Sequence, residues 1–286
     1  MFFLNNNIVG GEKMQKGIDV SAYQGKIDWT RIKPYIDFAI IRCGWGNDSE
    51  AQDDIYYERN SKACEDLGIP YGVYLFSYAT TLDEARSEVL HTLRLIRNKK
   101  LEYPVFLDVE EKRQMSLPKE TLTEIVKYYC EEMERHGYYV GIYASLDRFK
   151  SNLDSRDLDR FDKWVAEWNN RFTYEGKAGM WQQTSYEELP GIRGRVDGDI
   201  AFYDYPKIIR DANLNHLGDE KYKFKVGDKV YVSGNVYENN DMSNVITTLC
   251  DQEYVIERII PNTLAPYQIA LGFVSESSLY QKVLND

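Results

Sequence analysis

Two carboxylates stand close together at the end of an apolar run. The segment VFLDVEEK contains Asp108 and Glu110, two residues apart. In a β-strand, side chains at positions i and i+2 project to the same face, so both acids are expected to enter one cavity. Such a pair suits acid–base cleavage of a glycosidic bond, in which one carboxyl group carries a proton. The alternative is a polar strand end whose acids face solvent, which is the commoner situation for a lone Asp-x-Glu.

Two further acids occupy comparable positions elsewhere in the chain. Asp19 ends the apolar start of GIDVSAYQG, and Asp197 opens the apolar stretch of RVDGDIAF. If all four acids meet at one rim, crowding raises the cost of ionising every one of them. At least one is then expected to hold a proton near neutral pH, as a glycosidic general acid must.

A second constellation is aromatic. Four large rings fall near the same ends of separate predicted strands, where they are suited to stacking on sugars or hydrogen bonding to them: Tyr74, Tyr143, Trp168 and Trp181. Each of these rings taken alone fits a core position equally well. They are therefore candidate substrate-binding residues, with core packing as the alternative.

Short apolar runs alternate with segments of helical period, which predicts βα units around a parallel sheet and an α/β fold. The helical stripes cover residues 85–96, opened by Thr81 and Glu84 at capping-box spacing, and residues 122–133, after Pro118. The eight predicted strands are 17–21, 38–42, 71–76, 105–109, 139–144, 163–168, 179–183 and 196–202. Too few residues separate the last three for full βα units. We therefore expect a barrel that is irregular in its final third, with its active site at the carboxyl ends of the strands.

The chain divides into a large and a small domain. After a helix-like segment at 205–210, the polar stretch DANLNHLGDE lacks periodicity, so residues 211–221 are interpreted as a linker. Residues 222–286 contain short alternating strands punctuated by Gly, Asn and Pro, which predicts a small all-β barrel or meander. The catalytic barrel is assigned to 16–210, and residues 1–15 to an N-terminal extension.

Composition excludes several kinds of partner. A net charge of −11 argues against nucleic acid, because phosphate binding needs clustered Lys and Arg. No apolar run reaches 18 residues, so no membrane insertion is expected. The four cysteines have no paired spacing and no histidine near them, so neither a metal nor another cofactor is predicted. Reduced thiols are expected, with a bridge between Cys64 and Cys130 left open.

Several motifs in order resemble the glycoside hydrolase family 25 lysozymes, which include phage endolysins and bacterial muramidases. They are GIDVSAYQG, FAIIRCGWGN, YGVYLFSYA, VFLDVEEK, GYYVGIYAS, KWVAEW, MWQQTS and VDGD. The resemblance implies an irregular TIM-like (β/α)5(β)3 barrel that cuts the β-1,4 bond between N-acetylmuramic acid and N-acetylglucosamine in peptidoglycan.

The same resemblance assigns roles to the candidate residues. Glu110 is implied to be the general acid/base, in a retaining reaction assisted by the substrate's N-acetyl group. Asp19, Asp108 and Asp197 are implied to support it, and Asp199 joins the substrate-binding residues. Three positions depart from the family pattern and are expected to alter subsite contacts: Leu75, where His is frequent, Gln183, where Tyr is frequent, and Asp199, where Asn is common.

The tail resembles bacterial SH3-like wall-binding modules through FKVGDKVYVSG and PYQIALGFVSESSLY. Its candidate wall contacts are Tyr231, Tyr237, Tyr267 and Phe273, which equally suit the core of a small barrel. The start MFFLNNNIVGGEK lacks the basic segment of a secretory signal. A phage endolysin is therefore expected, made in the host bacterial cytoplasm and acting on the wall after release. A non-catalytic wall-binding protein and a glycosidase acting on chitin-like polymers are the alternatives.

Overall fold

The computed structural model describes residues 8–9, 12–217, 222–260 and 263–281. It forms two compact units, Met1–Ile209 and Arg210–Asp286, each considered by itself below. The expected N-terminal extension lies largely outside the described residues. Its described part is a small antiparallel pair, β1 (Ile8–Val9) and β2 (Glu12–Lys13).

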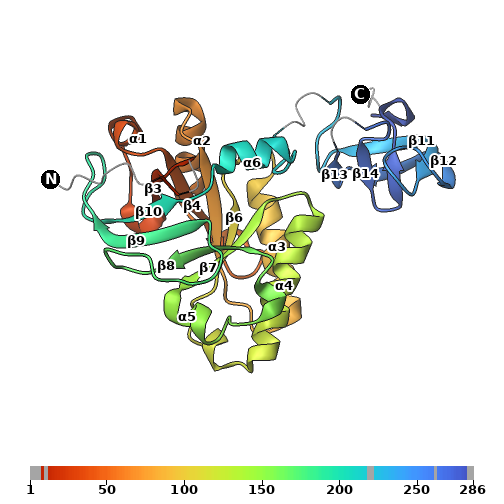
Figure 1. Ribbon diagram of the computed structural model, residues 1–286. Coiled ribbons are helices and arrows are strands. Elements are labelled where there is room, and N and C mark those ends of the chain that lie inside the picture. Colours follow the sequence, from red (N-terminus) through yellow and green to blue (C-terminus); the bar gives the residue numbers. More distant parts are fainter. Residues whose placement is uncertain (1–7, 10–11, 218–221, 261–262, 282–286) are drawn as a thin grey trace. The chain divides into compact units, whose positions relative to one another are not determined.

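A closed eight-stranded barrel forms the first unit (Figure 1), in the order β10-β3-β4-β5-β6-β7-β8-β9. The bounds are β3 Gln15–Val20, β4 Phe38–Trp45, β5 Tyr71–Phe76, β6 Val105–Asp108, β7 Val140–Ser145, β8 Asp162–Ala166, β9 Met180–Glu187 and β10 Val196–Ala201. All eight strands predicted from the sequence are present, and the mixed α/β class is confirmed.

The last strand of the barrel runs in the opposite direction to the others. Neighbours from β3 to β9 pair in parallel, whereas β10 pairs antiparallel with both β9 and β3. Only eight residues, 188–195, join β9 to β10, too few for the helical crossover that a parallel pair requires. Consequently the first residues of β10, not its last, reach the rim formed by the carboxyl ends of the parallel strands.

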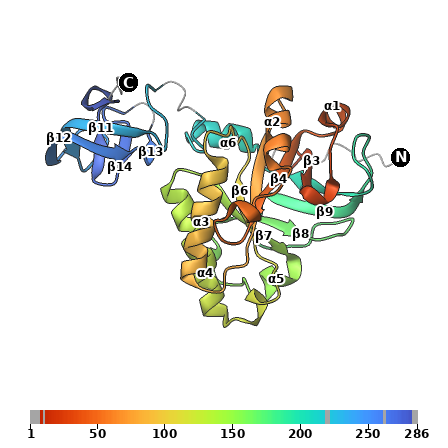
Figure 2. The ribbon, with the colours of Figure 1, turned by 180° about the vertical axis from the view of Figure 1, so that it is seen from behind.

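Helices cover the outside of the barrel (Figures 1 and 2), and α3 and α4 pack side by side. The helices are α1 Trp29–Ile32, α2 Tyr57–Leu67, α3 Leu82–Ile96, α4 Lys119–Arg135, α5 Leu146–Lys150 and α6 Tyr205–Asp211. Helix α3 begins where predicted, because the Thr81 side chain accepts a hydrogen bond from the amide of Glu84 at 3.2 Å. Among the described residues no helix stands between β8 and β10, so the final third is irregular, as expected.

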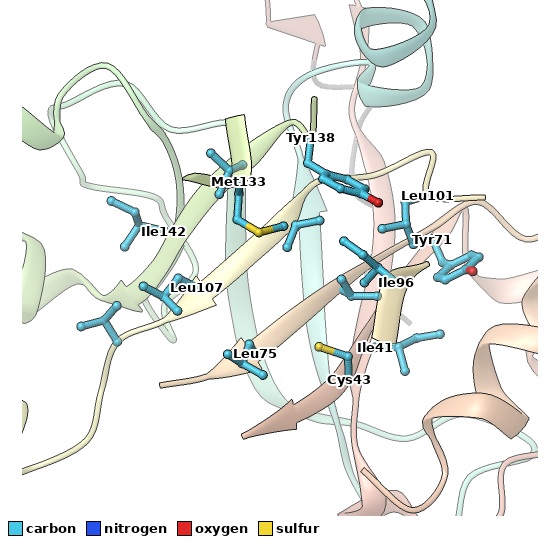
Figure 3. Packing of buried hydrophobic residues seen from close by; sticks show 14 of the residues in the cluster. Ile41, Cys43, Tyr71, Leu75, Ile96, Leu101, Leu107, Met133, Tyr138 and Ile142 are labelled. Carbon is cyan, nitrogen blue, oxygen red and sulfur yellow. The ribbon is translucent and has the colours of Figure 1, made fainter. Parts of the chain in front are cut away.

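The apolar core lies between the strands and the surrounding helices (Figure 3). Leu75 of β5, Leu107 of β6 and Ile142 of β7 pack there together with Ile96 of α3 and Met133 of α4. Each such side chain contributes about 1.5–3 kcal/mol when fully buried. The four cysteines are free, so no bridge joins Cys64 and Cys130. No helix among the described residues is both long and apolar enough to span a membrane.

The second unit is an antiparallel sheet with its own apolar core. Its strands are β11 Lys229–Tyr237, β12 Val245–Val255, β13 Arg258–Ile259, β14 Tyr267–Ile269, β15 Gly272–Val274 and β16 Leu279–Tyr280. Of the candidate wall contacts, Tyr267 and Tyr237 are buried, whereas Tyr231 stacks on Tyr280 and Phe273 is half-buried. Burial makes Tyr267 a core residue, and only Tyr231 and Phe273 keep substantial exposure for a contact.

Candidate active site

An open pocket of about 330 Å³ lies at the rim of the barrel. Acids, amides and aromatic rings line it: Asp19, Ser21, Tyr23, Gln24, Arg42, Trp45, Tyr74, Phe76, Tyr78, Asp108, Glu110, Tyr143, Trp164, Gln182 and Asp197. All four acids proposed as catalytic are in this set, and so are two of the proposed sugar contacts, Tyr74 and Tyr143. Residues far apart in the sequence therefore meet in one cavity.

Strand direction and register explain this meeting. Asp108 is the last residue of β6, paired in register with Tyr143 of β7, and Glu110 follows two residues later on the same side. On the opposite side, antiparallel pairing puts Asp197 directly across from Asp19. Side chains directly opposite one another lie on the same face of a sheet. Because β10 is reversed, its first acid joins an acid near the end of β3.

Burial and neighbouring charges raise the pKa values of these acids. Burial, followed by the charge of Asp197, raises the pKa of Glu110, while Arg148 opposes this shift. Glu110 nevertheless stands at the exposed side of the pocket, where substrate can reach it. Asp108 is only 3% exposed, its Oδ1 has no hydrogen-bond partner, and burial and Glu110 raise its pKa well above the usual range. Both shifts are in the direction that a general acid requires.

Asp19 and Asp199 form a second acidic pair. Burial, then Asp199 and Asp197, raise the pKa of Asp19 well above its usual range. Burial also raises the pKa of Asp199 to about 8. Asp199 is 2% exposed and accepts a 2.8 Å hydrogen bond from Trp164 Nε1, so it lies beneath the pocket lining. The expectation that Asp199 contacts substrate is thus not met in this geometry, because the Trp164 ring and its own burial separate it from the pocket.

Trp181 also lies outside the pocket. It pairs with Ile200 on the outward face of the barrel, packs against Phe172 with ring centroids 5.4 Å apart, and donates to the Glu167 carbonyl at 2.7 Å. Strand alternation is the physical reason, since neighbouring Gln182 takes the inward face. Interpreting Trp181 as a sugar contact was wrong for this pocket.

Gln182 is the central residue that the sequence prediction omitted. Its Nε2 donates to Asp19 Oδ2 at 2.8 Å, and its Oε1 accepts from the Tyr143 hydroxyl and from Trp168 Nε1, each at 3.0 Å. Trp168 does not line the pocket; it is 66% exposed and is joined to the site through Gln182. The signal was available in MWQQTS, because the amide adjacent to an outward Trp must point inward.

The sequence analysis also missed a cationic residue in the pocket lining, Arg42. The Arg42 guanidinium is held by the buried Asp54 carboxylate, with Nε at 2.9 Å and Nη2 at 2.8 Å. It lies 5.2 Å from the ring centroids of both Tyr23 and Trp45. Among the described residues that line the pocket, Arg42 is the cation, and it opposes the rise in the pKa of Asp108.

None of the three departures from the family pattern places a side chain in the pocket lining, since Asp199 lies beneath it. Leu75 is completely buried in the outer core, and Gln183 does not line the pocket. The expected change in subsite contacts therefore does not arise from either side chain. Among the described residues, no cluster of three or more His, Cys, Asp or Glu is arranged to hold a metal ion.

Comparisons with known proteins find matches for the first unit of the chain. The model of the glycosyl hydrolases family 25 matches residues 18–192, which is more than half of the chain. Among curated proteins, the uncharacterized protein YegX of Escherichia coli K12 is 28% identical over 194 residues, covering 64% of this chain and 68% of YegX.

Solved structures of similar fold include an autolysin and a bacterial lysozyme. The modular autolysin LytC from Streptococcus pneumoniae, in complex with a synthetic peptidoglycan ligand, is 32% identical with a TM-score of 0.59. That match covers 65% of this chain but 46% of LytC, so the chain spans about half of that protein. The bacterial lysozyme from Streptomyces coelicolor has the same fold, with 20% identity, a TM-score of 0.59 and coverage of 72% of this chain and 97% of the lysozyme.

Proposed function

The chain belongs to the glycosyl hydrolases family 25, and from this premise we propose that it is a peptidoglycan hydrolase of the lysozyme type. The bond cleaved is the β-1,4 linkage between N-acetylmuramic acid and N-acetylglucosamine. One observation carries the proposal: Glu110 and Asp108 share an aromatic-lined pocket with Asp19 and Asp197. The peptidoglycan ligand in the structure of LytC supports the choice of polymer.

Glu110 acts as general acid in this proposal. Its raised pKa favours the protonated carboxyl, and its exposed position lets it give the proton to the bridging oxygen. The same group, once ionised, then activates water as a general base.

Asp108 and Asp197 stabilise the positive charge that develops at the anomeric carbon. The charge of Glu110 is one cause of the raised pKa of Asp108, so Asp108 ionises more easily while Glu110 holds its proton. Arg42 favours the same ionisation. The substrate's own N-acetyl oxygen serves as nucleophile, and the configuration at the anomeric carbon is retained.

The substitution Glu110→Gln tests this assignment. Purified Gram-positive cell walls are digested, and mass spectrometry of the products identifies the broken bond. Glu110→Gln is expected to abolish glycan cleavage, whereas Glu111→Gln, a matched change next to it in the chain but outside the pocket lining, is expected to keep it. Undiminished cleavage by Glu110→Gln contradicts the assigned role.

The same digest separates the alternative functions. A non-catalytic wall-binding protein would sediment with walls without producing new reducing ends. A chitin-directed glycosidase would cut N-acetylglucosamine oligomers faster than muropeptides. Products that end in reducing N-acetylmuramic acid support the muramidase.

For the second unit we propose an SH3-like module that binds the cell wall. Tyr231 and Phe273 are its half-buried aromatic candidates. In the full chain carrying Glu110→Gln, the further change Tyr231→Ala is expected to reduce co-sedimentation with walls. Unchanged binding by this variant and by Phe273→Ala counts against the module.

We also propose a phage origin, with synthesis in the host cytoplasm and release by a separate membrane-permeabilising protein. Expression in a Gram-positive host should therefore leave cells intact until the membrane is permeabilised.

A further inference from the structure

A buried carboxylate outside the pocket holds one of the segments that line it. Glu88 of α3 is 1% exposed. Its Oε1 accepts from the amides of Tyr78 at 2.6 Å and Ala79 at 3.0 Å, and its Oε2 accepts from Ser77 Oγ at 2.7 Å. These three residues directly follow β5, where the regular hydrogen bonding of the strand ends. The Glu88 carboxylate thus supplies the acceptors for a stretch of irregular backbone.

The same stretch is tied to the segment that carries Glu110. The Ser77 amide donates to the carbonyl of Asp108 at 2.9 Å. Gln114, which is fully buried, donates from Nε2 to Ser77 Oγ at 2.8 Å and to the Ala79 carbonyl at 3.1 Å. Because Asp108 and Gln114 flank Glu110 in the chain, residues 77–79 bind both ends of the segment that presents the proposed acid.

A carboxylate is a costly choice at this position. Burial raises the pKa of Glu88 to about 7, against the opposing effect of its three donors. An apolar side chain would pack a helix against a barrel without this cost, but it would leave the buried amides of Tyr78 and Ala79 without this acceptor. The Glu88 carboxylate therefore fixes the position of residues 77–79 at a cost in folding stability.

We propose that Glu88 is a positioning residue for the reaction, holding Tyr78 and the Glu110 segment in place through residues 77–79 and Gln114. Tyr78 lines the pocket, and its ring lies 5.6 Å from the Arg113 guanidinium, in the turn that follows Glu110. Glu88 itself does not line the pocket. This inference rests on the proposed hydrolase function for its kinetic effect, but not for its structural effect.

Three variants of the full chain separate positioning from stability. Glu88→Ala removes every acceptor, while Glu88→Gln keeps a carbonyl oxygen for the two amides. Thr92→Val is the matched control: Thr92 lies one turn further along α3, is fully buried, and bonds Tyr129 at 2.8 Å and the Glu88 carbonyl at 2.9 Å, without touching the pocket segments. Both Glu88→Ala and Thr92→Val should lower thermal stability.

Only the loss of positioning should change the kinetics strongly. Displacement of an acid by about 1 Å can cost roughly 100-fold in rate. We expect Glu88→Ala to lower kcat by about 10- to 100-fold on cell walls, and by more than KM rises. Glu88→Gln should restore most of kcat, and Thr92→Val should leave kcat within about threefold. Equal losses of kcat in Glu88→Ala and Thr92→Val at matched stability would overturn the proposal.

Hydrogen exchange decides the structural part independently of activity. The Tyr78 and Ala79 amides should exchange faster in Glu88→Ala than in the unchanged chain, and Thr92→Val should not reproduce this change. Unchanged exchange at both amides in Glu88→Ala refutes the inference. If the unchanged chain fails to cut walls, the proposed function fails, whereas the exchange result still determines whether Glu88 holds this segment.

Discussion

Replacing Asp199 by Asn should make the barrel less sensitive to rising pH. Asp199 is buried beneath the pocket, and its Oδ1 accepts from Trp164 Nε1 at 2.8 Å. Asn keeps that acceptor and has nearly the same shape. It removes a buried titrating group. Asn is also the residue expected at this position from the family pattern.

The direction of the effect follows from proton binding. An unfolded Asp ionises with a pKa of about 3.9, whereas burial raises the pKa of Asp199 in the fold to about 8. Between these values the folded state binds more protons than the unfolded state, so stability falls as pH rises. The stabilisation due to the raised pKa of Asp199 is fully present below the pKa of the unfolded Asp and is lost progressively as the pH rises to about 8. Asn does not titrate. The free energy of unfolding of the variant, relative to that of the unchanged chain, should therefore increase between these two pH values.

The size of this relative gain in stability is set by the difference between the folded and unfolded pKa values of Asp199. About four pKa units correspond to roughly 5 kcal/mol at most, at 1.36 kcal/mol per unit. The Asp19 side chain opposes the rise in the pKa of Asp199 through a hydrogen bond, and the two carboxyls compete for a proton. We therefore expect a relative gain of about 2–3 kcal/mol between pH 4 and pH 8.

Denaturant unfolding monitored by tryptophan fluorescence measures the barrel selectively. The five tryptophans are Trp29, Trp45, Trp164, Trp168 and Trp181, all within the first unit. Unfolding free energies of both proteins are compared at pH 5 and pH 8. A difference between variant and unchanged chain that is the same at both pH values would refute the assigned titration of Asp199.

The remaining predictions concern the pocket. Asp197→Asn should lower the pKa of Glu110 and shift the basic limb of the pH–rate profile to lower pH. Arg148→Met should raise that pKa and shift the same limb to higher pH. Shifts of the same sign in both variants would contradict the assigned charges. Asp54→Ala breaks a buried ion pair of 2.8 Å and should cost about 3–5 kcal/mol in denaturant unfolding. Gln182→Leu leaves a buried carboxylate without its donor, and kcat/KM on cell walls should fall about tenfold or more.

The local pattern of apolar and polar residues was sufficient to predict the strands and long helices of this fold. Alternating and helical periods depend on which face of a single element is buried, and this can be seen within a few residues. The eight barrel strands and the two long helices α3 and α4 were therefore predictable. Asp19, Asp108 and Glu110 were also identifiable, because each stands at or just after the carboxyl end of a strand, where a barrel builds its site.

Which side chains share the pocket was decided by the tertiary structure. Trp181 and Gln182 are neighbours in the chain, yet strand parity within a closed barrel sends one outward and the other to Asp19. Arg42 comes from a strand whose inward face is defined only when the barrel closes.

The chain by itself determined the inventory of acids, rings and strands, because residue type and local period are properties of short segments. Only tertiary structure decided the reversed direction of β10, the raised pKa values and the link from Glu88 to Glu110. Each of these depends on groups far apart in sequence whose distance and burial are set by closure of the barrel. Burial removes water from around a charge, and that effect on a carboxyl group exists only once the surrounding strands are in place.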